Sequence, residues 1–200
     1  MRPAIAMLMF VLLTSGACGG SPSSDEPSSP SPSGPTTGST LTLMLKDSPF
    51  SDAKALLVTF SEVNVHASGG GWITVPFAGG VSSRTCDLKK LQTAQDILGV
   101  GTLAAGHYTQ LRLVVSSATV YLRDASSGPA CAPSITINAS SGTTFPVDIP
   151  SGEIRLNREF DLTSGGGTMI VLDFDGDRSV RQTGNGRYMM SPVIAIVSVS

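Results

Sequence analysis

Apolar and polar residues alternate along most of the chain after residue 40, with the period of two that indicates β-strands. Leu41, Leu43 and Leu45 alternate with Thr42, Met44 and Lys46, and the same alternation returns in later segments. Further strands are predicted at residues 57–65, 72–76, 111–115, 119–123, 134–137, 143–149, 153–162, 168–174, 179–183 and 188–199.

Short clusters of Gly, Pro, Ser and Asn separate these segments, and two of the clusters predict hairpins, at residues 69–71 and 184–186. Residues 88–98 (LKKLQTAQDIL) are the helical candidate. Residues 189–199 are apolar on both faces, which predicts a strand in the middle of a sheet, with a bulge at Pro192. The fold class expected is all-β: an antiparallel, Greek-key-like β-sandwich of about ten short strands with one short connecting helix.

The composition agrees with strands and turns. Charged residues make up 14% of the chain, against about 25% in typical globular proteins, while Gly and Pro number 22 and 13. The formal net charge of -2 leaves no basic surplus for a phosphate backbone, so no nucleic-acid partner is expected.

The first 17 residues have the features of a secretory signal peptide. Arg2 is followed by ten apolar residues, too few to span a bilayer, and then by small residues up to Cys18. The segment resembles a bacterial lipoprotein signal, which implies that Cys18 carries the lipid, palmitate included, as the first residue of the mature protein. Ordinary signal cleavage, with Cys18 a nearby thiol, is the alternative.

Residues 18–40 are expected to form a disordered tether, because after Cys18 they contain only Gly, Ser, Pro, Thr and one Asp-Glu pair. The domain is therefore expected to cover residues 41–200. Gly19 is not an acidic retention signal, which favours the outer membrane of a bacterial envelope.

Two cysteines remain in an exported chain once Cys18 is set aside. A disulfide between Cys86 and Cys131 is expected, since an oxidising compartment favours it and no Cys-x-x-Cys pair suggests a metal site. A metal-binding or nucleophilic cysteine is the alternative.

The order of several short motifs over residues 40–197 resembles the family catalogued as domain of unknown function 4382. The motifs are LMLKDSP (43–49), VTFSEVNVH (58–66) with Trp72 after it, AGHYTQLRL (105–113), PSGEI (150–154), LDFD (172–175) and TGNG (183–186) with PVI (192–194). Members are typically exported and often lipoproteins. The resemblance implies a β-rich domain without an assigned activity, so it transfers no site residues.

Candidate site residues are therefore chosen from the chain itself. Asp173, Asp175 and Asp177 alternate at the end of an apolar strand, so they are a candidate calcium site, with a solvated strand end as the alternative. Trp72 and Tyr108 are candidate ligand-binding residues because aromatic rings stack on ligands.

No cofactor other than this calcium is expected, and no catalytic residue is identified. The function expected is that of a noncatalytic envelope lipoprotein with a binding or structural role, whose partners are the membrane and an envelope polysaccharide or protein. A carbohydrate-binding or adhesion module is the alternative, and a hydrolase with an unrecognised site is the third possibility.

Overall fold

The structure of the protein is a computed structural model that describes residues 37–48 and 53–200. The expected signal segment (1–17), Cys18 and residues 19–36 of the expected tether lie outside the described residues. Among the residues described, neither helix has the length and apolar content that a membrane crossing requires.

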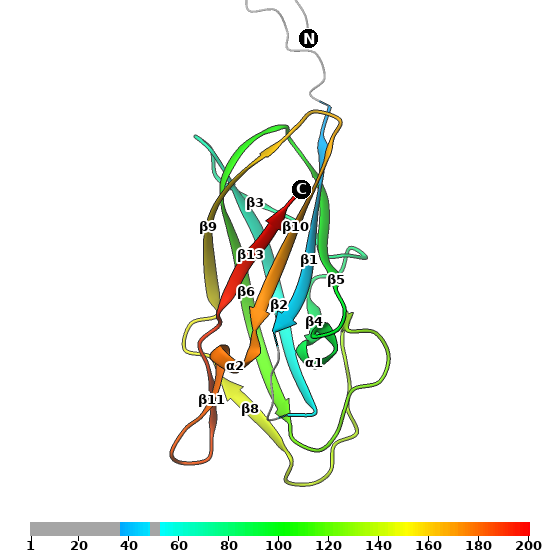
Figure 1. The fold of residues 1–200 in the computed structure, drawn as a ribbon, viewed down its shortest axis with the longest axis vertical. Coiled ribbons are helices and arrows are strands. Elements are labelled where there is room, and N and C mark those ends of the chain that lie inside the picture. Colours follow the sequence, from blue (N-terminus) through cyan, green and yellow to red (C-terminus); the bar gives the residue numbers. More distant parts are fainter. Residues whose placement is uncertain (1–36, 49–52) are drawn as a thin grey trace, which may run out of the picture. The chain divides into compact units, whose positions relative to one another are not determined.

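Thirteen strands and two four-residue helices make up the described part of the chain, which confirms the all-β prediction. The strands form two sheets. In spatial order, the smaller sheet contains β13 (Ile194–Val199), β10 (Gly167–Asp175), β1 (Ser39–Ser48) and β5 (Asp96–Leu103). Figure 1 shows β13, β10 and β1 side by side in one layer, with β6 and β2 of the other sheet behind them.

The larger sheet is organised around two long strands, β2 (Ala55–Ala67) and β6 (Gly106–Tyr121), which pair antiparallel over almost their whole length. The main path of this sheet is β11 (Val180–Gln182), β12 (Tyr188–Met190), β8 (Thr144–Asp148), β6, β2, β4 (Arg84–Asp87) and β7 (Cys131–Ala132). Two further strands extend it: β3 (Trp72–Thr74) pairs with β2, and β9 (Glu153–Leu162) pairs with β6.

The alternation that predicted the strands also builds the core. Leu41, Leu43 and Leu45 of β1 are completely buried, and Phe60 of β2 meets Phe174 of β10 edge to face at 6.5 Å between ring centroids. Burial of such side chains from both sheets supplies most of the driving force for folding.

The pairing is less uniform than the sequence predicted. Most strand pairs are antiparallel as expected, but β1 runs parallel to β10 and β8 runs parallel to β12. The predicted strand boundary at Leu41 is two residues late, because Ser39 is already buried and its hydroxyl donates to the Gly166 carbonyl.

The predicted helix over residues 88–98 is wrong beyond its first turn. Helix α1 (Leu88–Leu91) begins with Asp87, whose side chain accepts from the Lys89 N–H, and the chain then enters β5 at Asp96. Gly99 and Gly101 of β5 allow Pro76 to lie close, since a Cβ at either position would meet Pro76 atoms at 3.0 and 2.8 Å. Tertiary pairing therefore overrides the local helical pattern.

The predicted central strand over residues 188–199 is also wrong, because it is two strands in different sheets. Pro192 lies between β12 and β13 and has no N–H to give to a ladder. The neighbouring N–H groups of Ser191 and Val193 bond instead to Ser179. β13 then lies at the edge of the smaller sheet, where Val197 is 49% exposed.

Both predicted hairpins are present. β2 turns into β3 through Gly69, and β11 turns into β12 through Gly186, both with positive φ.

Helix α2 (Gly176–Ser179) follows β10, and Asp175 caps it by accepting from the Arg178 N–H. Residues 119–121 continue β6 rather than forming a strand of their own, and residues 134–137 form no strand.

A disulfide joins Cys86 of β4 to Cys131 of β7, as the cysteine count predicted. The two residues lie opposite each other in the β4–β7 ladder rather than in loops, and both are buried. Asp96 supports the same strand, because its Oδ2 accepts from the Cys131 N–H at 2.9 Å.

Replacing both Cys86 and Cys131 with Ala is expected to lower the free energy of unfolding by about 2–4 kcal/mol, since the bond closes a long loop. Urea unfolding followed by circular dichroism measures the change. Reduction of the disulfide should lower the urea midpoint of the native protein to that of the double variant. It should leave the midpoint of the double variant unchanged. An unchanged native midpoint after complete reduction would contradict a stabilising bond.

Candidate ligand-binding face

Strand register brings polar side chains from β3, β2, β6 and β9 together on the outer side of the larger sheet. Residues that pair across neighbouring strands point to the same side, and so do residues two apart along a strand. We call this surface the polar face; its three rows are Trp72, His66, Gln110 and Asn157; then Thr74, Asn64, Arg112 and Arg155; then Glu62, Val114 and Glu153.

The residues between these positions point inward. Val63 and Val65 of β2 and Leu111 and Leu113 of β6 are completely buried in the core. The same alternation therefore places the polar residues on the outer side and buries the residues between them in the core. The buried residues keep the sheet rigid beneath the polar face.

Trp72 lies at the corner of the polar face and is half-buried by polar neighbours rather than by the core. The His66 ring meets it edge to face at 5.1 Å between centroids. The guanidinium carbons of Arg112 and Arg155 lie 4.7 and 5.8 Å from the centroid of the indole ring. The ring is therefore held in place by cation–π and edge contacts rather than by packing in the core.

Arg112 organises the charges at the centre of the face. Its terminal nitrogens lie 3.7 Å from the carboxylates of Glu62 and Glu153. Glu153 also accepts from Nε of Arg155 at 2.6 Å. Because these arginines and glutamates form ion pairs, the centre of the face is close to neutral and its side chains are restrained.

Hydrogen bonds restrain the second row further. Asn64, only 3% exposed, donates to Glu62 at 3.2 Å and accepts from the Thr74 hydroxyl at 2.9 Å. In the first row, Nδ1 of His66 lies 3.1 Å from the Thr109 hydroxyl. The amides of Gln110 and Asn157 have no such bond within the described residues, so they remain available to a ligand.

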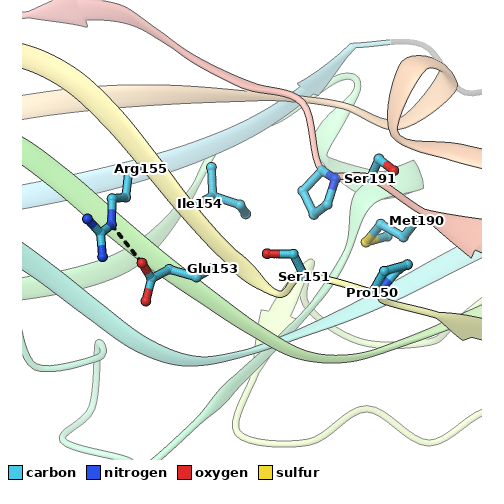
Figure 2. A pocket seen from close by; sticks show the side chains of 8 residues that line it. Pro150, Ser151, Glu153, Ile154, Arg155, Met190 and Ser191 are labelled. Carbon is cyan, nitrogen blue, oxygen red and sulfur yellow. Dashed lines mark hydrogen bonds and ion pairs between the residues drawn. The ribbon is translucent and has the colours of Figure 1, made fainter.

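Three hollows follow β9 beside the polar face. The first, of about 380 Å³, lies between the start of β9 and the segment after β12; Figure 2 shows Glu153 and Arg155 at one end of it and Pro150 and Met190 at the other. A second, of about 540 Å³, is lined by Thr109, Gln110, Asn157, Arg158 and Glu159. A third, of about 320 Å³, lies between β9 and β13 and shares Arg155 with the first and Arg158 with the second.

The two predicted ligand-binding residues have different positions. Trp72 lies on the polar face, whereas Tyr108 is 2% exposed and stacks on Phe160 in the core at 5.3 Å. The Tyr108 hydroxyl donates to the Ala104 carbonyl, and burial raises its pKa. Tyr108 therefore presents no ring to a ligand.

The three carboxylates predicted as a calcium site serve other purposes. Asp173 pairs with Lys46 at 2.7 Å and accepts from the Ser48 hydroxyl, and Asp175 caps α2. Asp177 lies in the first turn of that helix. In the described part of the chain, no three His, Cys, Asp or Glu side chains form a group able to hold a metal ion.

Asp47 is a titratable group that the sequence analysis did not single out. It lies on the core side of β1 and is 4% exposed. Its Oδ1 accepts from the Gly176 N–H at 3.1 Å, while Oδ2 is buried without a hydrogen bond to any residue that the structure describes. Burial raises the pKa of Asp47 to about 7; the Gly176 N–H and the Gln92 side chain oppose the rise, and Asp173 and Asp175 add to it.

The sequence did contain a signal for Asp47. The alternation that buries Leu41, Leu43 and Leu45 also places residue 47 on the inner side of β1. A hollow of about 400 Å³ lies beside it, lined also by Lys46 and residues 91–95.

Comparisons with known proteins identify a family only. The family model described as domain of unknown function (DUF4382) matches residues 38–192. No curated protein and no solved structure matches the chain.

The titration of Asp47 predicts that stability falls as the pH rises from about 4 to about 7. An unfolded aspartate loses its proton near pH 4, whereas folded Asp47 keeps its proton up to about pH 7. Within this window the folded state holds more protons, so the free energy of unfolding decreases with pH, by a few kcal/mol at most.

Asp47→Asn cannot ionise and is therefore expected to flatten the dependence of the melting temperature on pH between 4 and 7. Asp148→Asn, at an exposed carboxylate paired with Arg187, is the matched control and should keep the native slope. Equal slopes in the native protein and Asp47→Asn would show that Asp47 does not titrate in this window.

Proposed function

The chain belongs to the family described as domain of unknown function (DUF4382), and from this starting point we propose that it is a noncatalytic binding module of the bacterial envelope that holds carbohydrate on its polar face. Sandwich folds host many unrelated functions, so the proposal rests on the site rather than on the fold.

The observation that carries the proposal is the restrained Trp72 ring beside free amides. A sugar presents a C–H face that packs on an aromatic ring and hydroxyls that bond to planar amides, carboxylates and guanidinium groups. The polar face offers Trp72 together with Gln110 and Asn157 in a single row. Because the strands fix these groups before binding, little conformational entropy is lost when a ligand arrives.

The carboxylates of the face support a binding role over a catalytic one. Glu62 and Glu153 are both engaged by Arg112. The two glutamates hold the Arg112 guanidinium against the Trp72 ring, which explains their position. Arg155 places a second cation beside the same ring.

We also propose that the module is anchored to the membrane through a lipid on Cys18, with the outer membrane as its location. The sequence supports this: a short apolar segment precedes small residues and Cys18, and a Ser, Pro and Gly-rich segment follows. Acyl chains on one cysteine bury enough methylene groups to hold a protein on a bilayer.

Trp72→Ala is expected to weaken binding of the full-length protein to envelope polysaccharide about tenfold, because the stacking contact is lost. Affinity electrophoresis through gels containing a panel of polysaccharides measures it. Tyr121→Ala, at a partly exposed ring at the far end of β6, is the matched control and should bind as the native protein does.

Equal retardation of Trp72→Ala and the native protein on every polysaccharide that binds would contradict the proposed face. Turnover of a substrate in a glycoside and ester hydrolase panel by the same preparation would contradict the noncatalytic role. Circular dichroism of each variant establishes that it is folded.

The mature protein extracted from membranes of its own host is expected to begin at Cys18 and to carry acyl mass. Intact mass spectrometry before and after reduction and alkylation identifies the first residue of the mature chain and any acyl mass. It also shows whether the thiols of Cys86 and Cys131 appear only after reduction. A Cys18→Ser variant should leave the membrane fraction. A native chain without added lipid would contradict the proposed anchor. The protein would then be expected in the soluble fraction.

A further inference from the structure

The third hollow beside β9 has an unbalanced positive charge. Of the residues that the structure describes, its lining contains Arg155 and Arg158 and no acidic residue; the remaining lining residues are Leu156, Asn157, Ile194, Ala195 and Ile196. The two hollows on either side each contain a glutamate, Glu153 in one and Glu159 in the other. Positive charge is therefore concentrated between β9 and β13.

Arg158 differs from the other arginines of this surface. Arg112 is paired with two glutamates, and Arg155 donates through Nε to Glu153. The Arg158 side chain is exposed and makes no hydrogen bond or ion pair with any residue that the structure describes. The Arg158 guanidinium thus has no partner among the described residues, in a hollow that also contains the Asn157 amide; Arg155 lines the same hollow, although its Nε is paired with Glu153.

This arrangement matches the chemistry of a carboxylate attached to a sugar. A guanidinium donates two parallel N–H bonds to a planar carboxylate, which fixes the orientation of the bound group. Ile194, Ala195 and Ile196 on the opposite wall provide apolar contact for ring carbons. A neutral sugar would leave the charge of Arg158 without a partner.

The hollow is continuous with the polar face. Asn157 lines both the second and the third hollow and also ends the row that begins at Trp72. A polymer that follows β9 therefore contacts the polar face and the third hollow together, with one arginine at each junction between hollows.

We propose that the ligand is an acidic polysaccharide, with its carboxylates bound in the hollow between β9 and β13 by Arg158 and Arg155. This inference rests on the proposed function and deepens it, because it names the class of carbohydrate. Arg158 supplies the discrimination between acidic and neutral chains, while Trp72 supplies stacking that both share.

The test uses the full-length protein with two probes of the same backbone: polygalacturonate, and polygalacturonate whose carboxylates have been reduced to hydroxymethyl groups. Affinity electrophoresis and calorimetry at low and at moderate salt measure binding. The native protein is expected to bind the acidic form about tenfold more tightly, with a difference that shrinks as salt rises.

Arg158→Gln is expected to lose this preference, with about tenfold weaker binding of the acidic form and unchanged binding of the reduced form. Arg181→Gln is the control, because it removes the same charge from an exposed position on β11, where Arg181 contacts the Met189 sulfur. It should bind both probes as the native protein does. Melting temperatures establish that both variants are folded.

The outcomes separate this inference from the proposed function. If the native protein binds both probes equally and Trp72→Ala weakens both, the binding face stands and the acidic preference is overturned. If Arg158→Gln binds the acidic form as tightly as the native protein does, the assignment of Arg158 is overturned. If the native protein binds neither probe nor any polysaccharide of the panel, the proposed function itself fails.

Discussion

The antiparallel pairing of β2 with β6 is the constraint on which the rest of the structure depends. These two strands contribute to both sides of the larger sheet, so their register determines which residues enter the core and which form the polar face. β6 occupies one edge of β2, and the other edge pairs with β4 at one end and β3 at the other. β8 and β9 divide the free edge of β6 similarly. The disulfide and the polar face consequently lie at opposite ends of one continuous support.

Alternation along the chain was sufficient to predict most of the long strands, the hairpins and the fold class, because the period of two is local; it missed β4, β5 and β7. It failed where a partner distant in sequence decides the outcome. β5 has helix-forming residues before it, yet its pairing with β1 and its contact with Pro76 fix it as a strand. Pro192 was read as a bulge, but the chain uses it to leave one sheet for the other.

The candidate site was predictable only in part for the same reason. Trp72 was identified from its chemistry, but its companions Arg112 and Arg155 come from strands β6 and β9, and only the register shows that they share a side with it. Tyr108 looked equally suitable, and its place in the core follows from a register shift beside Gln110. Asp47 could have been found, because it continues the inward series of β1.

The parallel pairing of β1 with β10 has a consequence for the order of folding. Lys46 and Asp173 are neighbours although 127 residues separate them, and β1 lies between β10 and β5 in the middle of its sheet. β1, the first strand of the domain, therefore cannot complete its pairing until β10 is available. Such distant contacts slow folding. The smaller sheet is therefore expected to form only after most of the chain is available.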